Sequence, residues 1–455
     1  MTAREIDTGI SALLGAPKRL KLLAFRGRGC SPLAALPWLL WSPNTGSMKR
    51  SGLSRLVFAA LVTVLLIVLN LRLYYSPYSR AGELDTEGLA QLRFLDDAIA
   101  AGAADQMQRL FPEGFVFLHA LHGLSWAELA RAPAASSALR AEALQRARSA
   151  LREIESEQGR AVFSQKLSPP YGIFYAGWST WLRGVILHAA GPDVDPEEAR
   201  LFTAQCDRIA AAFDQSATPF LQSYVGSAWP SDSLTAVAAL RLHDYLLTPR
   251  YERTIAEWLQ RLRSRLDAET GLIPHAAFSA SKQESVRGSS QSLMLRFLME
   301  IDPGLAGEHY RQYRTLFHTT WLGLPAKREY PVGIDGMGDV DSGPVVFGIG
   351  ASATVVGLGT ARAFNDDRLA TALGQAMELV GFPFSMSERK RYIGGMLPIG
   401  DAFLVWSKLA RPHVAAPPPG AHAPLIAWWW RLPTHAISLG IVFLLGLWLR
   451  LMRAI

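Results

Sequence analysis

Apolar residues recur at spacings of three and four positions through most of residues 86–380, which is the period of an amphipathic helix. The pattern predicts helices over 86–102, 137–155, 172–191, 197–215, 233–247, 251–266, 289–301, 304–322, 352–364 and 368–380. Weaker stretches near 115–130 and 400–410 bring the total to about twelve. No run of alternating apolar and polar positions competes with them, so an all-α fold is expected.

The predicted helices alternate in character along the chain. Those at 137–155, 197–215 and 251–266 carry charge on one face, whereas those at 172–191, 233–247, 289–301 and 352–364 are mostly small and apolar. Buried helices that alternate with half-exposed ones are typical of two concentric rings. The sequence therefore predicts an (α/α)6 barrel, or toroid. A stacked solenoid is the alternative, but no repeat of fixed period is present.

Two apolar stretches outside this helical region are predicted to be transmembrane helices. They are LVFAALVTVLLIVLNL, from Leu56 to Leu71, and LPTHAISLGIVFLLGLWL, from Leu432 to Leu449. Each approaches the ~17–25 residues needed to cross a bilayer. Aromatic side chains, which favour the membrane interface, stand beside both: Tyr74, Tyr75, Trp428, Trp429 and Trp430. A cleaved signal peptide is the alternative for the first stretch, although no clear cleavage site follows it.

The net charge of +7 is concentrated ahead of the first apolar stretch. Residues 1–55 hold nine Lys and Arg but only two acids, whereas the rest of the chain carries 37 residues of each sign. Because basic residues stay on the cytoplasmic side, we expect two spans in the inner (plasma) membrane, with both termini cytoplasmic and the main domain periplasmic or extracytoplasmic. The balanced main domain offers no basic patch for nucleic acid, so no nucleic-acid partner is expected.

These features predict five parts: a basic cytoplasmic segment (1–55), a transmembrane helix (56–75), a barrel domain (76–427), a second transmembrane helix (428–450) and a cytoplasmic tail (451–455). Met48, which Lys49 and Arg50 follow, is an alternative start. Cys30 and Cys206 fall on opposite sides of the membrane in this topology, so no disulfide is expected. No CxxC or HExxH motif is present, and we expect neither a metal site nor a cofactor.

Polar residues gather in three segments that lead into apolar helices. They are YVGSAWPSDS (224–233), ETGLIPHAAFSASKQESVRGSS (269–290) and KREYPVGIDGMGDVDSGP (327–344). In a barrel, the loops that enter the inner helices meet at one end, where they surround the mouth of a cavity. This end is the predicted functional site.

Four acids in these segments are the candidate catalytic residues: Asp232, Glu329, Asp339 and Asp341. Asp339 and Asp341 point to the same side if the DVD segment is extended. Two neighbouring carboxylates repel, which raises the pKa of one of them and allows a division into acid and base. Two Asp oxygens with loop carbonyls also suit Ca²⁺, a question that the sequence leaves open.

Each acid has a structural alternative. Asp232 and the DVD acids stand just before apolar helices, where they can cap the free N–H groups of the first turn. Glu329 has basic neighbours in the sequence, so it can form an ordinary salt bridge with Lys327, Arg328 or Arg287.

Aromatic and basic side chains near the same segments are the candidate substrate-binding residues: Tyr171, Tyr175, Trp178, Trp229, His275 and Arg287. The aromatic residues of PYGIFYAGWSTW recur at spacings of three and four, as a stripe on one helix face does. Such a stripe either stacks on a sugar or isoprenoid, or packs in the core. His275 is either a proton carrier or a hydrogen-bonded structural residue.

From Tyr171 to Asp401, about half of the chain, the sequence resembles the linalool dehydratase/isomerase-like family. The resemblance runs through YAGWSTWLRG, WPSDSLTAVAAL, DAETGLIPHAAFS, EIDPGLAGEHYRQYRTLF, KREYPVG and DVDSGP. It implies an (α/α)6 barrel whose acidic loop includes Glu329, Asp339 and Asp341. The family uses a cysteine and a histidine to move water on and off an allylic alcohol. Asp232 and Trp178 stand at those two positions here, so linalool chemistry is not expected unchanged.

A cavity with carboxylates and aromatic side chains favours acid–base catalysis. The first hypothesis is a membrane-anchored glycan hydrolase or lyase in which Asp232 and Asp341 are the acid and base, supported by Asp339 and Glu329. The second is a hydratase, dehydratase or isomerase that acts on an isoprenoid or lipid alcohol. The third is a non-enzymatic scaffold for the cell envelope. An open polar cleft favours the first, a closed apolar cavity the second, and salt-bridged or capping acids the third.

Overall fold

The structure is a computed structural model that describes residues 47–76, 78–79, 83–192, 195–278, 284–340, 342–414 and 422–454. It is mostly helical, with three short β-hairpins. The described residues divide into two compact units, one from Leu71 to Thr434 and one made of residues 47–70 and 435–454. The segment ahead of residue 47, which includes Cys30, lies outside the described residues.

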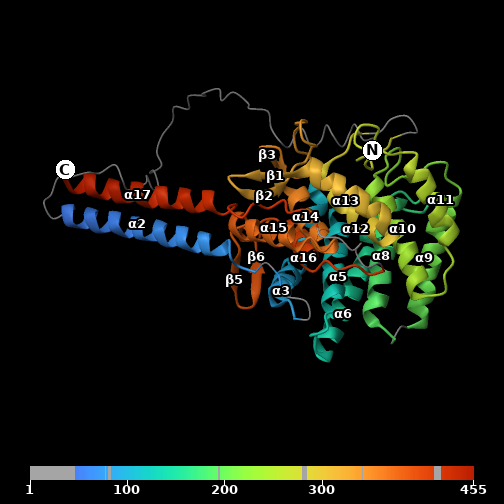
Figure 1. Ribbon diagram of the computed structural model, residues 1–455. Coiled ribbons are helices and arrows are strands. Elements are labelled where there is room, and N and C mark those ends of the chain that lie inside the picture. The colour runs from blue at the N-terminus through green and yellow to red at the C-terminus, as the bar shows by residue number, and fades with distance from the viewer. Residues whose placement is uncertain are drawn as a thin grey trace, which may run out of the picture. The chain divides into compact units, whose positions relative to one another are not determined.

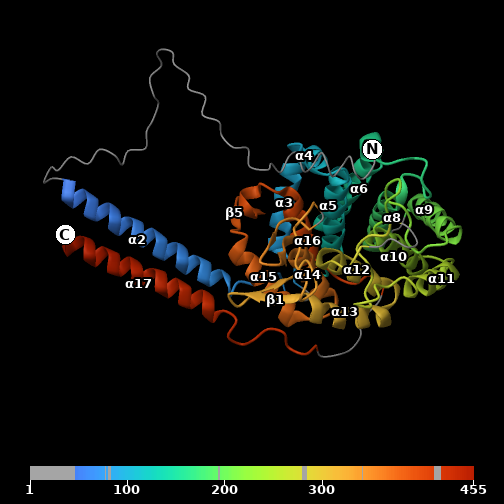
Figure 2. The same cartoon turned by 90° about the horizontal axis from the view of Figure 1, so that it is seen from above.

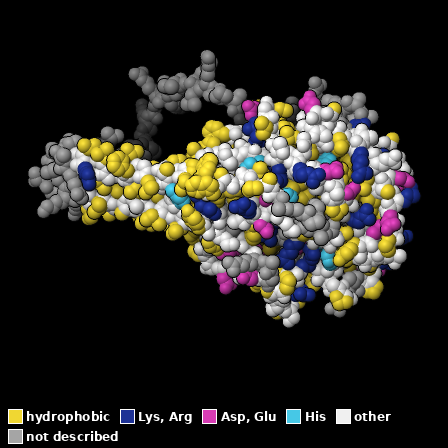
Figure 3. Space-filling view, in the orientation of Figure 1, with side chains coloured by type: hydrophobic (Ala, Val, Ile, Leu, Met, Phe, Trp, Pro, Cys, Tyr) yellow, Lys and Arg dark blue, Asp and Glu magenta, His cyan; other side chains and the backbone are white. Residues whose placement is uncertain are grey.

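The smaller unit contains most of two long apolar helices, α2 (Ser47–Arg72) and α17 (Leu432–Ala454), which lie side by side (Figures 1 and 2). Their windows Gly52–Arg72 and Leu432–Met452 are long and apolar enough to cross a membrane, with mean hydropathies of 2.5 and 1.8. Hydrophobic side chains cover their outer surface (Figure 3). Between the helices, Asn70 Nδ2 donates to Ser438 Oγ at 2.7 Å. Such a polar contact between apolar helices favours their pairing in lipid.

Six helices of the larger unit are buried on nearly every side. These buried helices are α5 (Gly114–Ala130), α8 (Gly172–Ala190), α10 (Pro230–Leu246), α12 (Gly288–Ile301), α14 (Ala351–Ala363) and α16 (Pro398–Lys408). Each packs against the next one along the chain, and α16 also packs against α5. The N-terminal halves of these helices contain small residues and little charge, which suits helices surrounded by other helices.

Six further helices alternate with the buried ones and bury only one face. They are α3 (Thr86–Ala100), α6 (Ser137–Ile154), α9 (Pro196–Asp214), α11 (Glu252–Arg263), α13 (Pro303–Phe317) and α15 (Asp367–Val380). Two shorter helices, α4 (Ala103–Leu110) and α7 (Glu157–Arg160), and the 3-10 turn η1 (Ile393–Gly395) complete the set. The expected alternation of wholly and partly buried helices is confirmed.

The helix expected over 304–322 is wrong at its C-terminal end. α13 stops at Phe317, and the chain enters the hairpin of β1 (His318–Trp321) and β2 (Leu324–Lys327). Leu322 and Gly323 connect the strands with φ values of 49° and 83°, and positive φ at both positions is the requirement of a type I′ turn. The other hairpins are built on two-residue connections as well: β3 (Val345–Val346) with β4 (Ile349–Gly350), and β5 (Phe384–Met386) with β6 (Arg389–Arg391).

Aromatic side chains fill the space between the buried helices. Trp178 on α8 lies 4.8 Å from Phe117 on α5 and 5.5 Å from Phe297 on α12, measured between ring centroids. The ring centroid of Phe403, on α16, lies 4.9 Å from that of Phe117, and the ring centroid of Trp406 lies 6.2 Å from that of Trp178. Rings that meet edge to face bury large apolar areas and fix one another's orientation. These contacts tie four of the buried helices to one another.

The segment that follows α16 packs against the C-terminal ends of α5 and α12. The backbone N–H of His413 donates to Glu300 Oε1 at 2.9 Å, and its Nε2 lies 2.8 Å from Glu128 Oε1. Charge–charge attraction to Arg131 and His413 outweighs burial and lowers the pKa of Glu128 to about 2. The acids at this end are thus held by partners, and the candidate residues lie elsewhere, at the N-terminal ends of the helices.

Candidate functional site

Asp232 lies in the first turn of α10, with 6% of its surface exposed. Its carboxylate accepts a hydrogen bond from Ser223 Oγ at 2.5 Å and a weaker one from Ser231 Oγ at 3.5 Å. Trp229 occupies the N-cap position of α10 and makes no side-chain capping bond. Asp232 therefore faces side chains of a neighbouring segment, and the capping alternative does not describe its contacts.

Burial raises the pKa of Asp232 to about 7. The hydroxyl of Ser223 opposes this shift because it stabilises the carboxylate, whereas the negative charge of Glu113 adds to it. At neutral pH, protonated and ionised forms of Asp232 are both populated. This is the condition that a general acid needs to donate and recover a proton.

Glu113 is the second carboxyl of this site, and the sequence did not single it out. It immediately precedes α5, is partly buried, and accepts a hydrogen bond from the Tyr224 hydroxyl at 2.8 Å. Burial raises its pKa, and the Tyr224 hydroxyl partly opposes the shift. Its signal in the sequence was the Pro-Glu-Gly turn ahead of a helix rich in apolar residues, a turn of the same kind as the three polar segments.

Two consecutive residues, Ser223 and Tyr224, thus donate hydrogen bonds to the two carboxyl groups. Their segment is fixed from both sides: Ser223 N donates to Ser227 O at 3.0 Å, and Ile173 N donates to Gln222 O at 2.9 Å. Gly172, at the start of α8, has a φ of 81°, and a Cβ there would lie 2.4 Å from the carbonyl oxygen of Ser223. Only glycine allows α8 to approach the segment this closely.

Aromatic side chains surround the pair of carboxyls. Tyr224 stacks on Phe163 with ring centroids 5.7 Å apart and meets Trp229 edge to face at 6.0 Å. Trp229 is partly buried, whereas Trp178 is fully buried in the aromatic core. The Trp178 indole N–H favours the charged form of Asp232, yet Nε1 makes no hydrogen bond of standard geometry within the described residues. Trp178 therefore lies in the packing position that the sequence allowed as its alternative.

Arg287 gathers two of the other candidate acids at the N-terminus of α12. Its Nε donates to Glu329 Oε1 at 2.9 Å, and its Nη1 and Nη2 form a forked ion pair with Asp339, the second bond at 2.9 Å. Glu329 is fully buried and also accepts from the Ser289 hydroxyl at 2.7 Å. These contacts agree with the salt-bridge alternative for Glu329, with Arg287 as the partner.

The ion pair has opposite effects on the two acids. Burial raises the pKa of Glu329, although Ser289 and Arg287 oppose the shift. For Asp339, burial also raises the pKa, but the hydrogen bond and charge of Arg287 dominate and bring it to about 2. Asp339 is half exposed and stays ionised at neutral pH. Its partner in the predicted acid pair, Asp341, lies outside the described residues, so the expected separation of Asp232 and Asp341 stays a prediction.

His275 adjoins the Arg287 cluster. Its Nδ1 lies 2.5 Å from Ser290 Oγ, and its Nε2 lies 3.3 Å from Arg287 Nη1. Burial and the Arg287 charge lower the pKa of His275 to about 3, so the imidazole is neutral at physiological pH. Because a guanidinium only donates, Nε2 of His275 is the acceptor and Nδ1 carries the hydrogen. His275 here positions Arg287 and Ser290.

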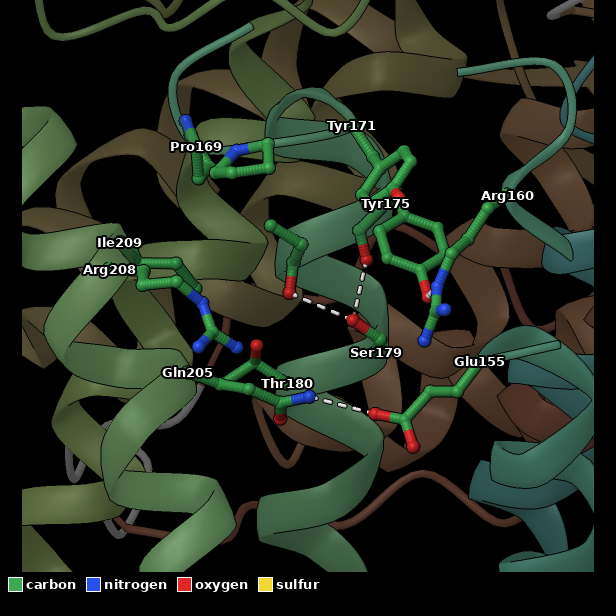
Figure 4. Close-up of a pocket in the computed structure, with 12 residues that line it drawn as sticks. Glu155, Arg160, Pro169, Tyr171, Tyr175, Ser179, Thr180, Gln205, Arg208 and Ile209 are labelled. Atoms are coloured by element: carbon green, nitrogen blue, oxygen red, sulfur yellow. Dashed lines mark hydrogen bonds between the residues drawn. The ribbon is translucent and has the colours of Figure 1, made fainter. Parts of the chain in front are cut away.

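Tyr171 and Tyr175 line a cavity of about 300 Å³ between α8, α9 and the segment ahead of α8 (Figure 4). Neither Asp232 nor Glu113 lines it. The structure therefore places the nine described candidate residues in different surroundings: Asp232 with Trp178 and Trp229, Arg287 with Glu329, Asp339 and His275, and the two tyrosines in a separate cavity. No group of three or more His, Cys, Asp or Glu in the described ranges is arranged to hold a metal ion.

No protein-family model matches the chain, and no curated protein matches it either.

Proposed function

We propose that the chain is a membrane-anchored enzyme in which Asp232 and Glu113 transfer protons at a carbon–oxygen bond of a neutral substrate. The observation that carries the proposal is the pair of carboxyls with raised pKa, held by Ser223 and Tyr224 at the N-terminal ends of α10 and α5. Strongly perturbed pKa values cluster at functional sites, where burial and neighbouring charges tune acids and bases.

The fold that we propose for the larger unit is an (α/α)6 barrel. Its support is the order of helix contacts: the six buried helices follow one another from α5 to α16, and α16 returns to α5, while a half-buried helix follows each of the first five and α3 precedes the set. In that arrangement Glu113, Asp232 and Arg287 all belong to one end of the inner ring. The resemblance to linalool dehydratase/isomerase-like proteins points to the same fold, and membership of that family is part of the proposal.

In the proposed reaction Asp232 acts as the acid. Its proton goes to the hydroxyl oxygen of the substrate, the C–O bond breaks, and water leaves. The ionised Glu113 takes a proton from the adjacent carbon, which leaves a C=C double bond, and the Tyr224 hydroxyl orients the Glu113 carboxylate. The same steps in reverse add water to a double bond. Proton exchange between the two carboxyls and solvent resets the site.

The substrate class that the geometry favours is an apolar alcohol, such as an isoprenoid or lipid alcohol. Asp232 is buried and its neighbour Trp178 belongs to an aromatic core, which suits an apolar substrate better than a hydrated polymer. This substrate class belongs to the second hypothesis from the sequence. The burial of Asp232 favours it over the glycan hypothesis.

A glycan hydrolase or lyase is the second candidate. The observation that favours it is the partly buried pair of Trp229 and Tyr224, whose rings suit stacking on a sugar at the edge of the carboxyl pair. The same two carboxyls then serve as acid and base across a glycosidic bond.

For the location, we propose an inner-membrane protein with the larger unit outside the cytoplasm. Its support is the presence of two helices apolar and long enough to span, together with the basic residues ahead of the first one. Trp428 and Trp429, just before α17, are 85% and 48% exposed, which suits side chains that meet a membrane interface.

The test uses the full chain in detergent with two substrate sets. Linear isoprenoid alcohols are incubated in H₂¹⁸O, and mass spectrometry follows loss of water and entry of ¹⁸O; envelope oligosaccharides are tested for added water or unsaturated ends. We expect turnover in the first set, reduced at least ~100-fold by Asp232→Asn. Asp335→Asn, whose side chain is 90% exposed, is the matched control and should retain activity. Turnover of glycans alone selects the second candidate, and turnover of neither set favours the scaffold.

A further inference from the structure

The cavity beside α8 lies away from the carboxyl pair. Its volume of about 300 Å³ is at the lower end of the range of small-molecule sites, ~300–1,000 Å³. Figure 4 shows Arg160 and Arg208 reaching toward it from opposite sides, with Tyr171 and Tyr175 along one wall.

The charges in this cavity do not balance. Its one acid, Glu155, is already engaged: both its oxygens lie 2.7 Å from Arg183 Nη2, and Oε1 also accepts from Gln205 at 2.8 Å. Arg160 and Arg208, in contrast, have no carboxylate within ion-pair distance among the described residues. The cavity therefore presents two guanidinium groups that form no ion pair with a carboxylate of the described residues.

Two aromatic side chains fix the position of the Arg160 guanidinium. Its Nε donates to the Tyr175 hydroxyl at 3.1 Å, and its guanidinium carbon lies 5.8 Å from the ring centroid of Tyr171. Both contacts fix the side chain while leaving the two Nη groups available, and a fixed guanidinium loses less entropy when it binds an anion. Arg208, on α9, is exposed and can close on a ligand from the other side.

The remaining walls include apolar side chains and a serine whose hydroxyl is already hydrogen-bonded. Pro169, Pro170 and Ile209 contribute apolar surface, and Ser179 Oγ is bonded to the backbone oxygen of Tyr175 at 2.7 Å. Tyr171 is partly buried and offers part of its ring to a flat or cyclic group, whereas the Tyr175 ring is buried against Phe163 and Tyr171. The cavity thus combines a cationic part with a ring-binding part.

We propose that this cavity binds a phosphomonoester carried on a sugar or aromatic ring, with Arg160 and Arg208 on the phosphate and Tyr171 against the ring. A guanidinium fork matches the spacing of phosphate oxygens, and two of them balance the ~1.5–2 negative charges of a monoester at neutral pH. The site is independent of the proposed reaction at Asp232, because it shares no lining residue with the carboxyl pair.

The test is isothermal titration of the full chain in detergent with phenyl phosphate and glucose 1-phosphate, compared with phenol, glucose and inorganic phosphate. At least one ring phosphate should bind ten-fold or more tightly than either of its parts. Which of the two binds identifies the ring as aromatic or sugar. No binding of either, or equal affinity for inorganic phosphate, overturns the proposal.

Two variants and one control locate the site. Arg208→Gln and Arg160→Gln should each weaken binding at least ten-fold. Arg208 is exposed, so its replacement leaves the fold intact and keeps the test sound if Arg160→Gln is poorly folded. The control is Arg200→Gln, which removes the same charge from the same helix at an exposed ion pair with Glu197. An equal loss in the control and in Arg208→Gln means non-specific attraction and contradicts the proposal.

Discussion

The Ser223 hydroxyl lies 2.5 Å from Oδ2 of Asp232 and donates to it. The next residue, Tyr224, donates to Glu113, so one short segment controls both carboxyls of the candidate site. The Ser223 bond favours the ionised form of Asp232 and limits the rise in pKa that burial causes. The balance between these two effects sets the protonation of the proposed acid.

Two substitutions should move the pKa of Asp232 in opposite directions. Ser223→Ala removes a hydrogen bond to the carboxylate and should raise the pKa further, whereas Glu113→Gln removes a nearby negative charge and should lower it. If catalysis uses Asp232, the pH profile of turnover shifts up in the first variant and down in the second. Profiles that both shift the same way, or stay fixed, contradict the assignment.

Asp232 and Asp401 should each make the folded chain less stable as the pH rises from about 4 to about 7. Burial raises the pKa of Asp232 and of Asp401, each to about 7, so the folded state holds protons that the unfolded chain has lost. Each group then contributes a loss of up to about 1.4 kcal/mol per pH unit in this window. Thermal unfolding in detergent should show a less negative pH slope of stability between pH 5 and pH 8 in Asp232→Asn and in Asp401→Asn than in the wild type. A double variant that keeps the full slope would falsify this explanation.

Replacing Arg287 should destabilise the folded chain more than replacing either of its acid partners, Glu329 or Asp339. Arg287→Gln leaves the fully buried Glu329 without its ionic partner, a change that costs about 3–5 kcal/mol in buried pairs. Glu329→Gln keeps the hydrogen-bonding shape, and Arg287 retains Asp339, so its cost should be smaller. Denaturant unfolding of both single variants and of the double variant measures the coupling. A double variant that costs as much as the two single variants added together would show that the residues do not interact.

Gly172 provides a test of the close approach between α8 and the Ser223 segment. In Gly172→Ala, the positive φ costs about 1–2 kcal/mol, and the contact with the Ser223 carbonyl oxygen adds about 1–3 kcal/mol of overpacking. Gly226→Ala is the matched control, because its φ of 79° is similar and no atom lies within 4 Å of the added Cβ. Gly172→Ala should lose more stability and also disturb Asp232, whereas equal losses would mean that the close contact is relaxed.

The sequence predicted the helices well because their burial follows the 3.6-residue period closely. The range 137–155 became α6 (Ser137–Ile154), and 368–380 became α15 (Asp367–Val380). The hairpin at 318–327 was missed because β-branched Thr319 and Thr320 stand within an apolar pattern that also fits a helix. The Leu322–Gly323 pair was the available turn signal.

The candidate site was harder to predict because its partners come from distant parts of the chain. Arg287 and Glu329 were both named, but only the fold brings the guanidinium to this acid rather than to a sequence neighbour. Glu113 lies 119 positions before Asp232, and no local pattern connects them. The pKa of Asp232 depends on burial, which a periodic pattern predicts for a helix face but not for one side chain at its end.

The most direct test of the account is the titration of Asp232 itself. Infrared difference spectra of the full chain in detergent, wild type minus Asp232→Asn, isolate the C=O stretch of this one carboxylic acid across a pH series. We expect the band to titrate with a midpoint near 7, because burial raises the pKa of Asp232. A midpoint near the ordinary aspartate value of about 4 would mean that Asp232 is a permanently ionised, structural carboxylate, and the proposed acid–base chemistry would be wrong.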